Sequence, residues 1–251
     1  MLIFADSLIM DTKKDWFTSW FNTPYYHILY KHRNDDDAQF FMRNITSFLN
    51  LKENSFIADV PCGKGRHSVY LNSLGFNVRG GDLSSNSIFH AKKFENESLK
   101  FEEWDMRKPI ENKYDAIFNL FTSFGYFDDD KDDILVLSNF KNGLKSNGVL
   151  VLDFLNVEKV KSSLVPQETK LIDGIEFSIK KEIIDGFILK HISFHANGQN
   201  HTYTEKVKFL SLEKMQDYFN KADLKIRHVF GNYNLDNFNV NTSDRLILIA
   251  E

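Results

Sequence analysis

The chain has 251 residues, 42% of them hydrophobic, and a formal net charge of -4. This length and apolar content can bury one substantial core, which fits one α/β domain with an insertion better than two separate domains. The acidic balance gives no overall positive field that would gather a polyanion, so we expect no nucleic acid partner.

The N-terminal ten residues, MLIFADSLIM, are apolar, but they contain Asp6 and lack a basic segment, so they do not match a secretory signal. No stretch approaches the ~20 uninterrupted apolar residues that cross a membrane. The single cysteine, Cys62, excludes an internal disulfide framework and suits a reducing compartment. We therefore expect a soluble, cytoplasmic protein with no membrane segment.

Helical patterns dominate residues 1–50, which we expect to form a helical cap within the same domain. In DWFTSWFNTPYYHILYKHR, Pro24 separates two short helical pieces. The acids of NDDD then suit the positive end of a helix over residues 35–50. The apolar positions at helical spacing there are Ala38, Phe41, Met42, Ile45 and Leu49.

From Phe56 the chain alternates short apolar runs with helical patterns, which is typical of βαβ units in a parallel sheet. Gly75 and Gly148 lie where connections should turn. The predicted strands are residues 56–60, 76–81, 99–104, 114–120 and 149–155. One intervening helix is predicted from Ile134, Leu137, Phe140 and Leu144. The acidic run DDDKDD at 128–133 lacks the glycine and final glutamate of a calcium loop, so we interpret it as a solvated helix start.

The pattern changes after Pro166. Asp173-Gly174, Asp185-Gly186 and Asn197-Gly198 separate stretches rich in Ile, Phe and Val, and each dipeptide is a strong hairpin signal. We expect an antiparallel meander over residues 168–210, followed by a helix at 211–222 and two strands at 224–231 and 244–250. The expected division is a cofactor-binding core at 51–156, an inserted antiparallel substrate lid at 157–210, and a C-terminal completion of the core sheet at 211–251.

Candidate ligand-binding residues follow two of the predicted strands. Gly63 and Gly65 lie between a strand and a helix, where the backbone can approach a ligand closely. Ser68 stands where a dinucleotide fingerprint has its third glycine, so NAD is imperfectly matched, and no P-loop string is present. Asp59 and Asp82 end neighbouring strands, at the edge where doubly wound sheets bind ligands. A carboxylate there can bridge two ribose hydroxyls, which points to a nucleoside ligand.

These segments resemble the class I S-adenosylmethionine-dependent methyltransferases. ADVPCGKGRH resembles the acid and glycine-rich loop of that family, Asp82 in GGDLS its ribose-binding acid, Asp105 in EWDMR its acid beside the adenine, and YDAIFNLFTSFGYF its segment beside the methyl group. The segments WFTSWFNTPYYHILYKHR, CGKGRHS, NLFTSFGYF, VLDFLN and SDRLILIAE further resemble the small-molecule type of methyltransferase domain 25. One departure is Pro61, which replaces the usual first glycine, fixes φ and removes an N–H.

The resemblance covers nearly the whole chain and implies an α/β, doubly wound, mostly parallel seven-stranded sheet with a Rossmann-like methyltransferase fold. It implies S-adenosyl-L-methionine as the methyl donor, S-adenosyl-L-homocysteine as the product, and no metal. With the residues selected for their chemistry, the expected cofactor-binding set is Tyr26, Tyr30, Arg33, Asp59, Pro61, Cys62, Gly63, Gly65, Arg66, His67, Asp82, Leu83, Ser84, Asp105, Met106, Arg107, Asn119, Leu120, Phe121 and Phe124.

The chemistry of methyl transfer asks for positioning more than for a reactive side chain, since it is an in-line displacement with a neutral leaving group. Aromatic walls can stabilise the cationic donor. Arg33 could pair its carboxylate, and Asp59 could pair its ammonium through water or backbone. His191 and His195 share one face of the predicted meander, and either could take a proton from an acceptor. We name these two histidines and Tyr126 as candidate catalytic residues. The alternative is that each histidine is a half-exposed strand residue without a catalytic role.

The expected function is methyl transfer to a small-molecule N, O or C acceptor enclosed by the aromatic N-terminal segment and the meander. One alternative is an RNA or protein methyltransferase, which a basic face around Lys92, Lys93, Lys141 and Lys145 would favour, although these lysines have the spacing of solvated helix faces. The other is a non-catalytic sensor or scaffold that binds S-adenosylmethionine. Exposed aromatic residues would support a homodimer.

Overall fold

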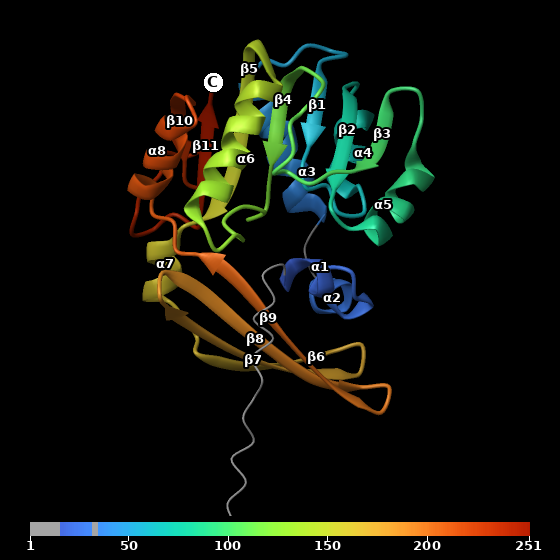
Figure 1. Cartoon of the computed structure of the whole chain (residues 1–251), viewed down its shortest axis with the longest axis vertical. Helices are drawn as coiled ribbons and strands as arrows, with labels where there is room; N and C mark the ends of the chain where they lie inside the picture. The colour runs from blue at the N-terminus through green and yellow to red at the C-terminus, as the bar shows by residue number, and fades with distance from the viewer. Residues whose placement is uncertain (1–15, 32–34) are drawn as a thin grey trace, which may run out of the picture.

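The computed structural model describes residues 16–31 and 35–251 (Figure 1). Arg33 and the apolar N-terminal ten residues therefore lie outside the described residues.

A seven-stranded sheet forms the centre of the chain. Neighbouring strands are parallel except that β11 runs antiparallel to both β5 and β10. The chain order reverses between β1 and β4, which is the switch point where a doubly wound sheet opens a crevice. The predicted fold class is confirmed. In spatial order the strands are β10 (Ile226–Phe230), β11 (Arg245–Ala250), β5 (Leu144–Leu155), β4 (Tyr114–Asn119), β1 (Phe56–Asp59), β2 (Asn77–Asp82) and β3 (Leu99–Glu103).

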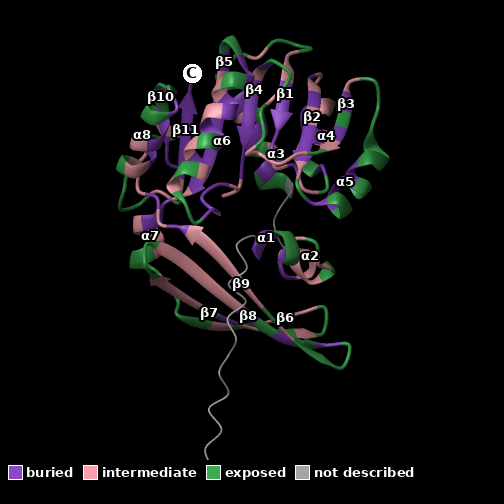
Figure 2. Cartoon of the chain, in the orientation of Figure 1, coloured by how far each residue is buried: buried purple, intermediate pink, exposed green. Residues whose placement is uncertain are grey.

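Helices cover both faces of this sheet and bury two apolar clusters against it. The first cluster holds Val136 and Phe140 of α6 (Asp130–Gly143) with Phe219 of α8 (Leu212–Lys221). The second holds Phe41 of α3 (Asp35–Phe48) and Leu71 of α4 (Arg66–Ser73). The buried class is concentrated in this part of the molecule (Figure 2). A short α5 (Ser85–Ala91) and a 3₁₀ turn (Lys92–Phe94) connect β2 to β3.

A separate four-stranded antiparallel sheet, which we call the lid sheet, lies below the carboxyl ends of the parallel strands in Figure 1. Its strands are β6 (Gln167–Ile172), β7 (Ile175–Ile184), β8 (Phe187–Ala196) and β9 (Gln199–Lys208). All three predicted dipeptides make the hairpin turns, and both residues of each have positive φ, as a type I′ turn requires.

Two short helices occupy the space between the sheets (Figure 1). They are α1 (Trp16–Trp20) and α2 (Pro24–Leu29), and Pro24 stands in the first turn of α2, where its missing N–H costs nothing. Trp20 stacks on Tyr203 of the lid sheet with ring centroids 4.5 Å apart. Tyr25 packs on Phe194 at 4.7 Å, so aromatic contacts join the helices to the inner face of the lid sheet.

Three details differ from the sequence prediction. Leu144, expected to continue a helix, begins β5 because α6 ends at Gly143. Helix α7 (Val157–Ser162) was not predicted. The acidic run does begin α6, with Asp129 as its N-cap, but its Asp133 is wholly buried rather than solvated. Lys208 Nζ lies 2.7 Å from the Asp133 carboxylate, which explains how that acid is accommodated.

Candidate functional site

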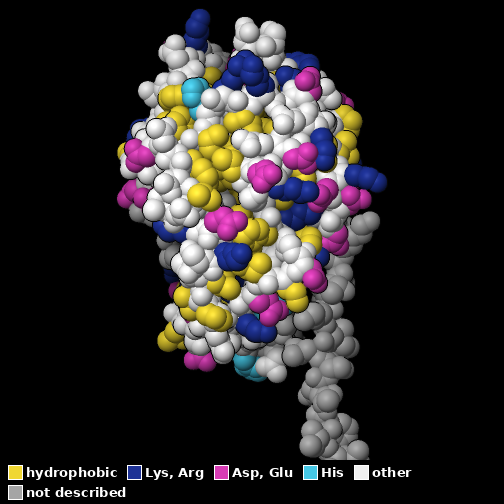
Figure 3. Space-filling model, turned by 90° about the vertical axis from the view of Figure 1, so that its left-hand side faces the viewer, with side chains coloured by type: hydrophobic (Ala, Val, Ile, Leu, Met, Phe, Trp, Pro, Cys, Tyr) yellow, Lys and Arg dark blue, Asp and Glu magenta, His cyan; other side chains and the backbone are white. Residues whose placement is uncertain are grey.

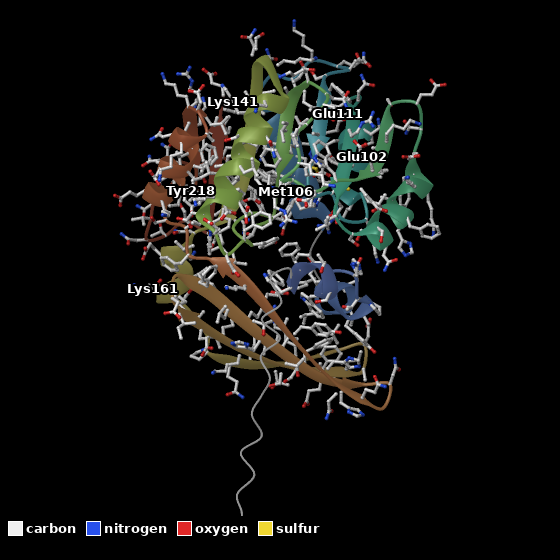
Figure 4. All side chains as sticks on the ribbon, viewed as in Figure 1. Glu102, Met106, Glu111, Lys141, Lys161 and Tyr218 are labelled. Carbon is white, nitrogen blue, oxygen red and sulfur yellow. The ribbon has the colours of Figure 1, made fainter. Side chains whose placement is uncertain are left out.

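A cavity of about 830 Å³ opens at the carboxyl ends of the parallel strands, on the side of α1 and α2. Figure 4 shows Met106, one of its lining residues, at this edge of the sheet. The sequence-predicted residues that line it are Tyr26, Tyr30, Pro61, Cys62, Gly63, Arg66, His67, Asp82, Leu83, Asp105, Met106, Leu120, Phe121 and Tyr126. We call this the first cavity.

The glycine loop forms one wall of the first cavity. Gly63 lines the cavity and has a φ of +56°. A Cβ built on it would have no atom within 4 Å, so the space beside Gly63 is open to a ligand. Gly65 does not line the cavity. Its φ is +84°, and a Cβ there would lie 2.6 Å from Phe101, so this glycine allows α4 to pack closely on β3. Gly65 therefore has a packing role, and its predicted contact with the cofactor stays a prediction.

Asp82 joins the glycine loop to the end of β2. Its Oδ2 accepts a hydrogen bond from the Gly63 N–H and its Oδ1 accepts one from the Ser84 N–H, both at 2.8 Å. Burial raises the pKa of Asp82, and these two hydrogen bonds act in the opposite direction. Because each carboxylate oxygen can accept more than one hydrogen bond, Asp82 retains acceptor capacity toward the cavity.

Asp59 lies beneath the loop instead of lining the cavity. Its side chain is 1% exposed, and its Oδ2 accepts a hydrogen bond of 2.6 Å from the Ser68 hydroxyl. Burial raises the pKa of Asp59 to about 7. The carboxylate is turned toward α4, so Asp59 cannot contact a ligand ammonium directly, and the predicted pairing through water or backbone stays a prediction.

Four other predicted residues also support the wall from behind. Ser84 accepts a hydrogen bond from Ser87 N and caps α5. Arg107 holds Asp105 through Nε and Nη2, with a contact of 2.8 Å. Asn119 is buried and donates to the Val60 carbonyl at 2.8 Å, and Phe124 is 1% exposed in the core. None of these four lines the first cavity, so the sequence named the correct segments but misjudged which side chains point inward.

The opposite wall is aromatic. Tyr26, Tyr30 and Tyr126 face the cavity as predicted, and His67 stacks on Phe121 with ring centroids 4.4 Å apart. The sequence missed the remaining lining residues, which are Phe17, Phe21, His27, Lys31, Lys64, Ser87, Trp104, Ser123 and Phe127. The aromatic lead segment signalled part of this set, but its folding onto the sheet edge depends on contacts distant in sequence.

A second cavity of about 400 Å³ lies between the lid sheet and the central sheet. Phe21, Tyr26, Tyr30 and Tyr126 line both cavities and thus form a shared aromatic wall. The other lining residues of the second cavity are Trp16, Thr122, Leu155, Val160, Ser163, Leu164, Val165, Lys181, Ile188, Lys190, Glu205, Val207 and Arg245.

The candidate catalytic histidines lie on the outer face of the lid sheet. Along β8 the even-numbered Ile192 and Phe194 are buried, whereas His195 is exposed. His191 hydrogen bonds Glu182 and Thr204, each at 3.0 Å, and His195 bonds Asn200. Neither histidine lines either cavity. The prediction correctly placed both on one face, but side chains alternate along a strand and this face is directed away from the site.

The described part of the chain offers neither a metal site nor a membrane span. Among residues 16–31 and 35–251, no group of three His, Cys, Asp or Glu side chains could hold a metal ion. No helix in the same ranges has the length and apolarity to cross a membrane. On the face drawn in Figure 3, basic and acidic side chains are interspersed.

Comparison with known proteins decides the family. A family described as "Methyltransferase domain" matches residues 51–215. The chain belongs to this methyltransferase family. The match begins before β1 and ends within α8, so it includes the glycine loop, Asp82 and the whole lid sheet. The class I methyltransferase family predicted from the motifs is thereby confirmed, while the narrower resemblance to domain 25 stays a prediction.

Curated relatives of this methyltransferase chain match over part of their length. A glycine/sarcosine N-methyltransferase of Halorhodospira halochloris is 36% identical over 112 residues, covering 41% of each chain. The glycine N-methyltransferase of Rattus norvegicus is 29% identical over 124 residues, covering 43% of this chain and 42% of that protein. The chain spans half or less of the length of the curated relatives it matches.

Solved structures match over nearly the whole methyltransferase chain. An S-adenosylmethionine-dependent methyltransferase of Clostridium acetobutylicum has a TM-score of 0.77 at 19% identity, with 90% of this chain and 95% of that chain covered. A sugar N-methyltransferase of a Streptoalloteichus species has a TM-score of 0.71 at 15% identity, with coverages of 90% and 91%. These similarities confirm the fold.

Proposed function

We propose that this protein transfers a methyl group from S-adenosyl-L-methionine to a small-molecule acceptor. The observation that carries the proposal is the first cavity, where the glycine loop and Asp82 meet an aromatic wall at the switch point of the sheet. The methyltransferase names of the relatives and of the structural neighbours support it.

The residues present fit this donor. Asp82 faces the cavity with acceptor capacity suited to two vicinal ribose hydroxyls. The open space at Gly63 lets the backbone approach the ligand. Asp105 lines the wall where the resemblance expects the adenine. Although burial opposes it, hydrogen bonding from Arg107 keeps the pKa of Asp105 below its usual range, so the carboxylate stays charged at neutral pH.

When bound, the donor supplies an electrophilic methyl group on a sulfonium. The aromatic wall of Tyr26, Tyr30 and Phe121 would stabilise the positive charge through their ring faces and exclude water. Tyr126 is fixed because its hydroxyl donates to the Thr122 carbonyl at 2.5 Å. Such fixed walls contribute by orienting reactants, which can supply a large part of the acceleration.

We assign residues 157–210 the role of a substrate lid, residues 1–50 that of a cap, and residues 51–156 with 211–251 that of the cofactor-binding core. A cytoplasmic location and a homodimer complete the proposal. The buried thiol of Cys62 suits a reducing compartment. Light scattering on the purified protein tests the homodimer.

A macromolecular acceptor is the alternative from another class. Lys145, one of the lysines that would mark a basic face, is paired with Asp115 at 2.8 Å, which weakens that alternative. A sensor that binds the donor without turnover predicts the same cavity, so only product formation separates it from an enzyme.

Calorimetric titration with S-adenosylmethionine and S-adenosylhomocysteine tests the proposal. Asp82→Ala should weaken both affinities by more than tenfold, because it removes the ribose acceptor and the partner of the Gly63 N–H. The matched control is Glu103→Ala: Glu103 pairs in register with Asp82 on β3 but is exposed and does not line the cavity. Wild type that binds neither compound, while another nucleotide binds, would overturn the proposal.

A further inference from the structure

The second cavity has its own charge pattern, which the methyl donor does not explain. Its wall presents the side chains of Lys181, Lys190 and Arg245 and one carboxylate, that of Glu205. The acids that pair Arg245 and Lys181 are Asp153 and Glu168, and neither lines the cavity. The surface that a ligand meets is therefore richer in cations than in anions.

Arg245 is held rigidly at the edge of β11. Its Nε donates to the fully buried Asp153 at 2.7 Å, and its Nη2 donates to the Thr122 hydroxyl at 3.0 Å. These bonds use two of the five N–H donors of a guanidinium, so the planar group keeps donors suited to a carboxylate or phosphate. The carbonyl of the same Thr122 accepts a hydrogen bond from the Tyr126 hydroxyl. Thr122 therefore connects Arg245 to Tyr126 of the shared aromatic wall.

Glu205 is held at the other side of the same wall. The Tyr30 hydroxyl contacts both of its carboxylate oxygens, at 2.6 and 2.7 Å, and Trp20 Nε1 donates to Oε1 at 2.8 Å. Lys190 Nζ lies 3.7 Å from Oε2, and the side chain of Glu205 is 15% exposed. A partly buried carboxylate beside the wall is a suitable partner for an amine or ammonium group.

The remainder of the second cavity is apolar. Its apolar residues beyond the shared wall are Trp16, Leu155, Val160, Leu164, Val165, Ile188 and Val207. A volume of about 400 Å³ is within the range of small-molecule pockets and far exceeds what a bare amine and acid would fill. The occupant therefore has an apolar body as well as two charged groups.

We propose that the second cavity binds the methyl acceptor, and that this acceptor is an amine carrying an anionic group and an apolar body. Arg245 holds the anion, Glu205 with Tyr30 holds the amine, and the apolar body lies against β5, α7 and the lid sheet. The amine then lies beside Phe21, Tyr26, Tyr30 and Tyr126, which border both cavities, so that its lone pair can reach the methyl group held in the first cavity. The N–C bond forms as the S–C bond breaks, S-adenosylhomocysteine is the leaving group, and the proton of the amine passes to the Glu205 carboxylate. This inference rests on the proposed function for the identity of the reaction, but the charge pattern is independent of it.

Binding can be measured without turnover, using protein saturated with S-adenosylhomocysteine, which has no methyl group to transfer. The probes are leucine, leucinamide, the aminophosphonate analogue of leucine, and glycine, each titrated by calorimetry. Leucine or the phosphonate should bind at least tenfold more tightly than leucinamide, and the stronger of the two identifies the anion. Leucine should also bind more tightly than glycine, because only leucine has a side chain that fills the apolar part of the second cavity.

Two variants assign the ends of the site. Glu205→Gln preserves shape and should weaken binding of the preferred probe at least tenfold, while the affinity for S-adenosylhomocysteine changes less than twofold. Arg245→Lys keeps the charge beside Asp153 and should cost about fivefold through loss of the planar fork. Glu182→Gln is the matched control, since Glu182 lies on the outer face of the same sheet with His191.

The outcomes separate the two proposals. Equal binding of leucine and leucinamide, equal effects of the Glu205 and Glu182 variants, or no binding of any probe to protein that binds S-adenosylhomocysteine would each overturn the acceptor assignment. Failure of wild type to bind S-adenosylhomocysteine at all would instead overturn the proposed function.

Discussion

The two cavities are built in different ways. In the first, α1 and α2 supply one wall, but the other is formed by short loops at the ends of β1, β2, β3 and β4, where position in the sheet brings Gly63, Asp82, Asp105 and Phe121 together. The second is assembled from helices α1 and α2, strand β5, the lid sheet and β11, which are far apart in the chain. Strand topology thus determines the donor end of the site, whereas side-chain packing determines the acceptor end.

The largest expected effect concerns the ion pair that connects the lid sheet to helix α6 of the central domain. Lys208 at the end of β9 is 5% exposed and lies 2.7 Å from the buried Asp133. Lys208→Met would leave that acid without its cation, so the free energy of unfolding should fall by about 3–5 kcal/mol. Urea denaturation measures it. The control is Lys206→Met, which removes an exposed pair with Asp128 and should lower the free energy of unfolding by less than about 1 kcal/mol. Equal losses of stability in the two variants would mean that Lys208 does not anchor the lid sheet to α6.

The buried acid under the glycine loop should give the donor region a distinctive pH dependence. The pKa of Asp59 is about 7 in the fold, well above the 3.8 of a solvated aspartate, because burial disfavours its charged form. The resulting stability is present below about pH 4 and is lost as pH rises through 7. As pH rises from 4 to 8, the free energy of unfolding of Asp59→Asn should therefore increase relative to that of wild type by up to about 4 kcal/mol.

Urea denaturation at several pH values measures this difference. Asp115→Asn is a control of opposite sign: burial opposes the shift, but the hydrogen bond from Lys145 holds the pKa of Asp115 below its usual value. Stability from Asp115 is present above about pH 4 and is lost on acidification. A flat difference between wild type and Asp59→Asn would contradict the buried placement of Asp59.

Alanine substitutions at two glycines test how closely α4 packs on β3. Gly65→Ala should cost about 2–4 kcal/mol, because it combines positive φ with a Cβ 2.6 Å from Phe101. Gly174→Ala in the lid sheet shares the positive φ but meets no atom within 4 Å, so about 1 kcal/mol is expected. Thermal unfolding of both variants provides the comparison, and similar costs would show that the approach of α4 to β3 is not tight.

The smallest effect is expected on the outer face of the lid sheet. His191→Ala removes a bond to the part-exposed Glu182, so stability should change by less than about 1 kcal/mol. The rate of methyl transfer, measured with an acceptor found by screening, should change less than twofold. A loss of tenfold or more would restore His191 as a catalytic candidate and contradict the assignment of the inner face to the acceptor.

The sequence predicted the central sheet because each βαβ unit repeats one pattern, and it predicted the hairpins because Asp-Gly and Asn-Gly fix the turn locally. The same local rules located Gly63 and Asp82. They failed where a side chain's direction depends on its neighbours: Asp59 and Asn119 belong to the right strand ends but point into the core. Glu205 and Arg245 carry no local signal, because only the folded lid brings them beside Tyr30 and Thr122.

The shared aromatic wall has a thermodynamic consequence. Phe21, Tyr26, Tyr30 and Tyr126 border both cavities, so a ligand that immobilises these rings from one side spares the second ligand that entropic cost. Donor and acceptor would then bind with positive cooperativity. Linkage requires the factor to be the same in both directions, and couplings of this kind are typically about 1–3 kcal/mol. A chain with this wall would retain each ligand longer in the ternary complex than in either binary one.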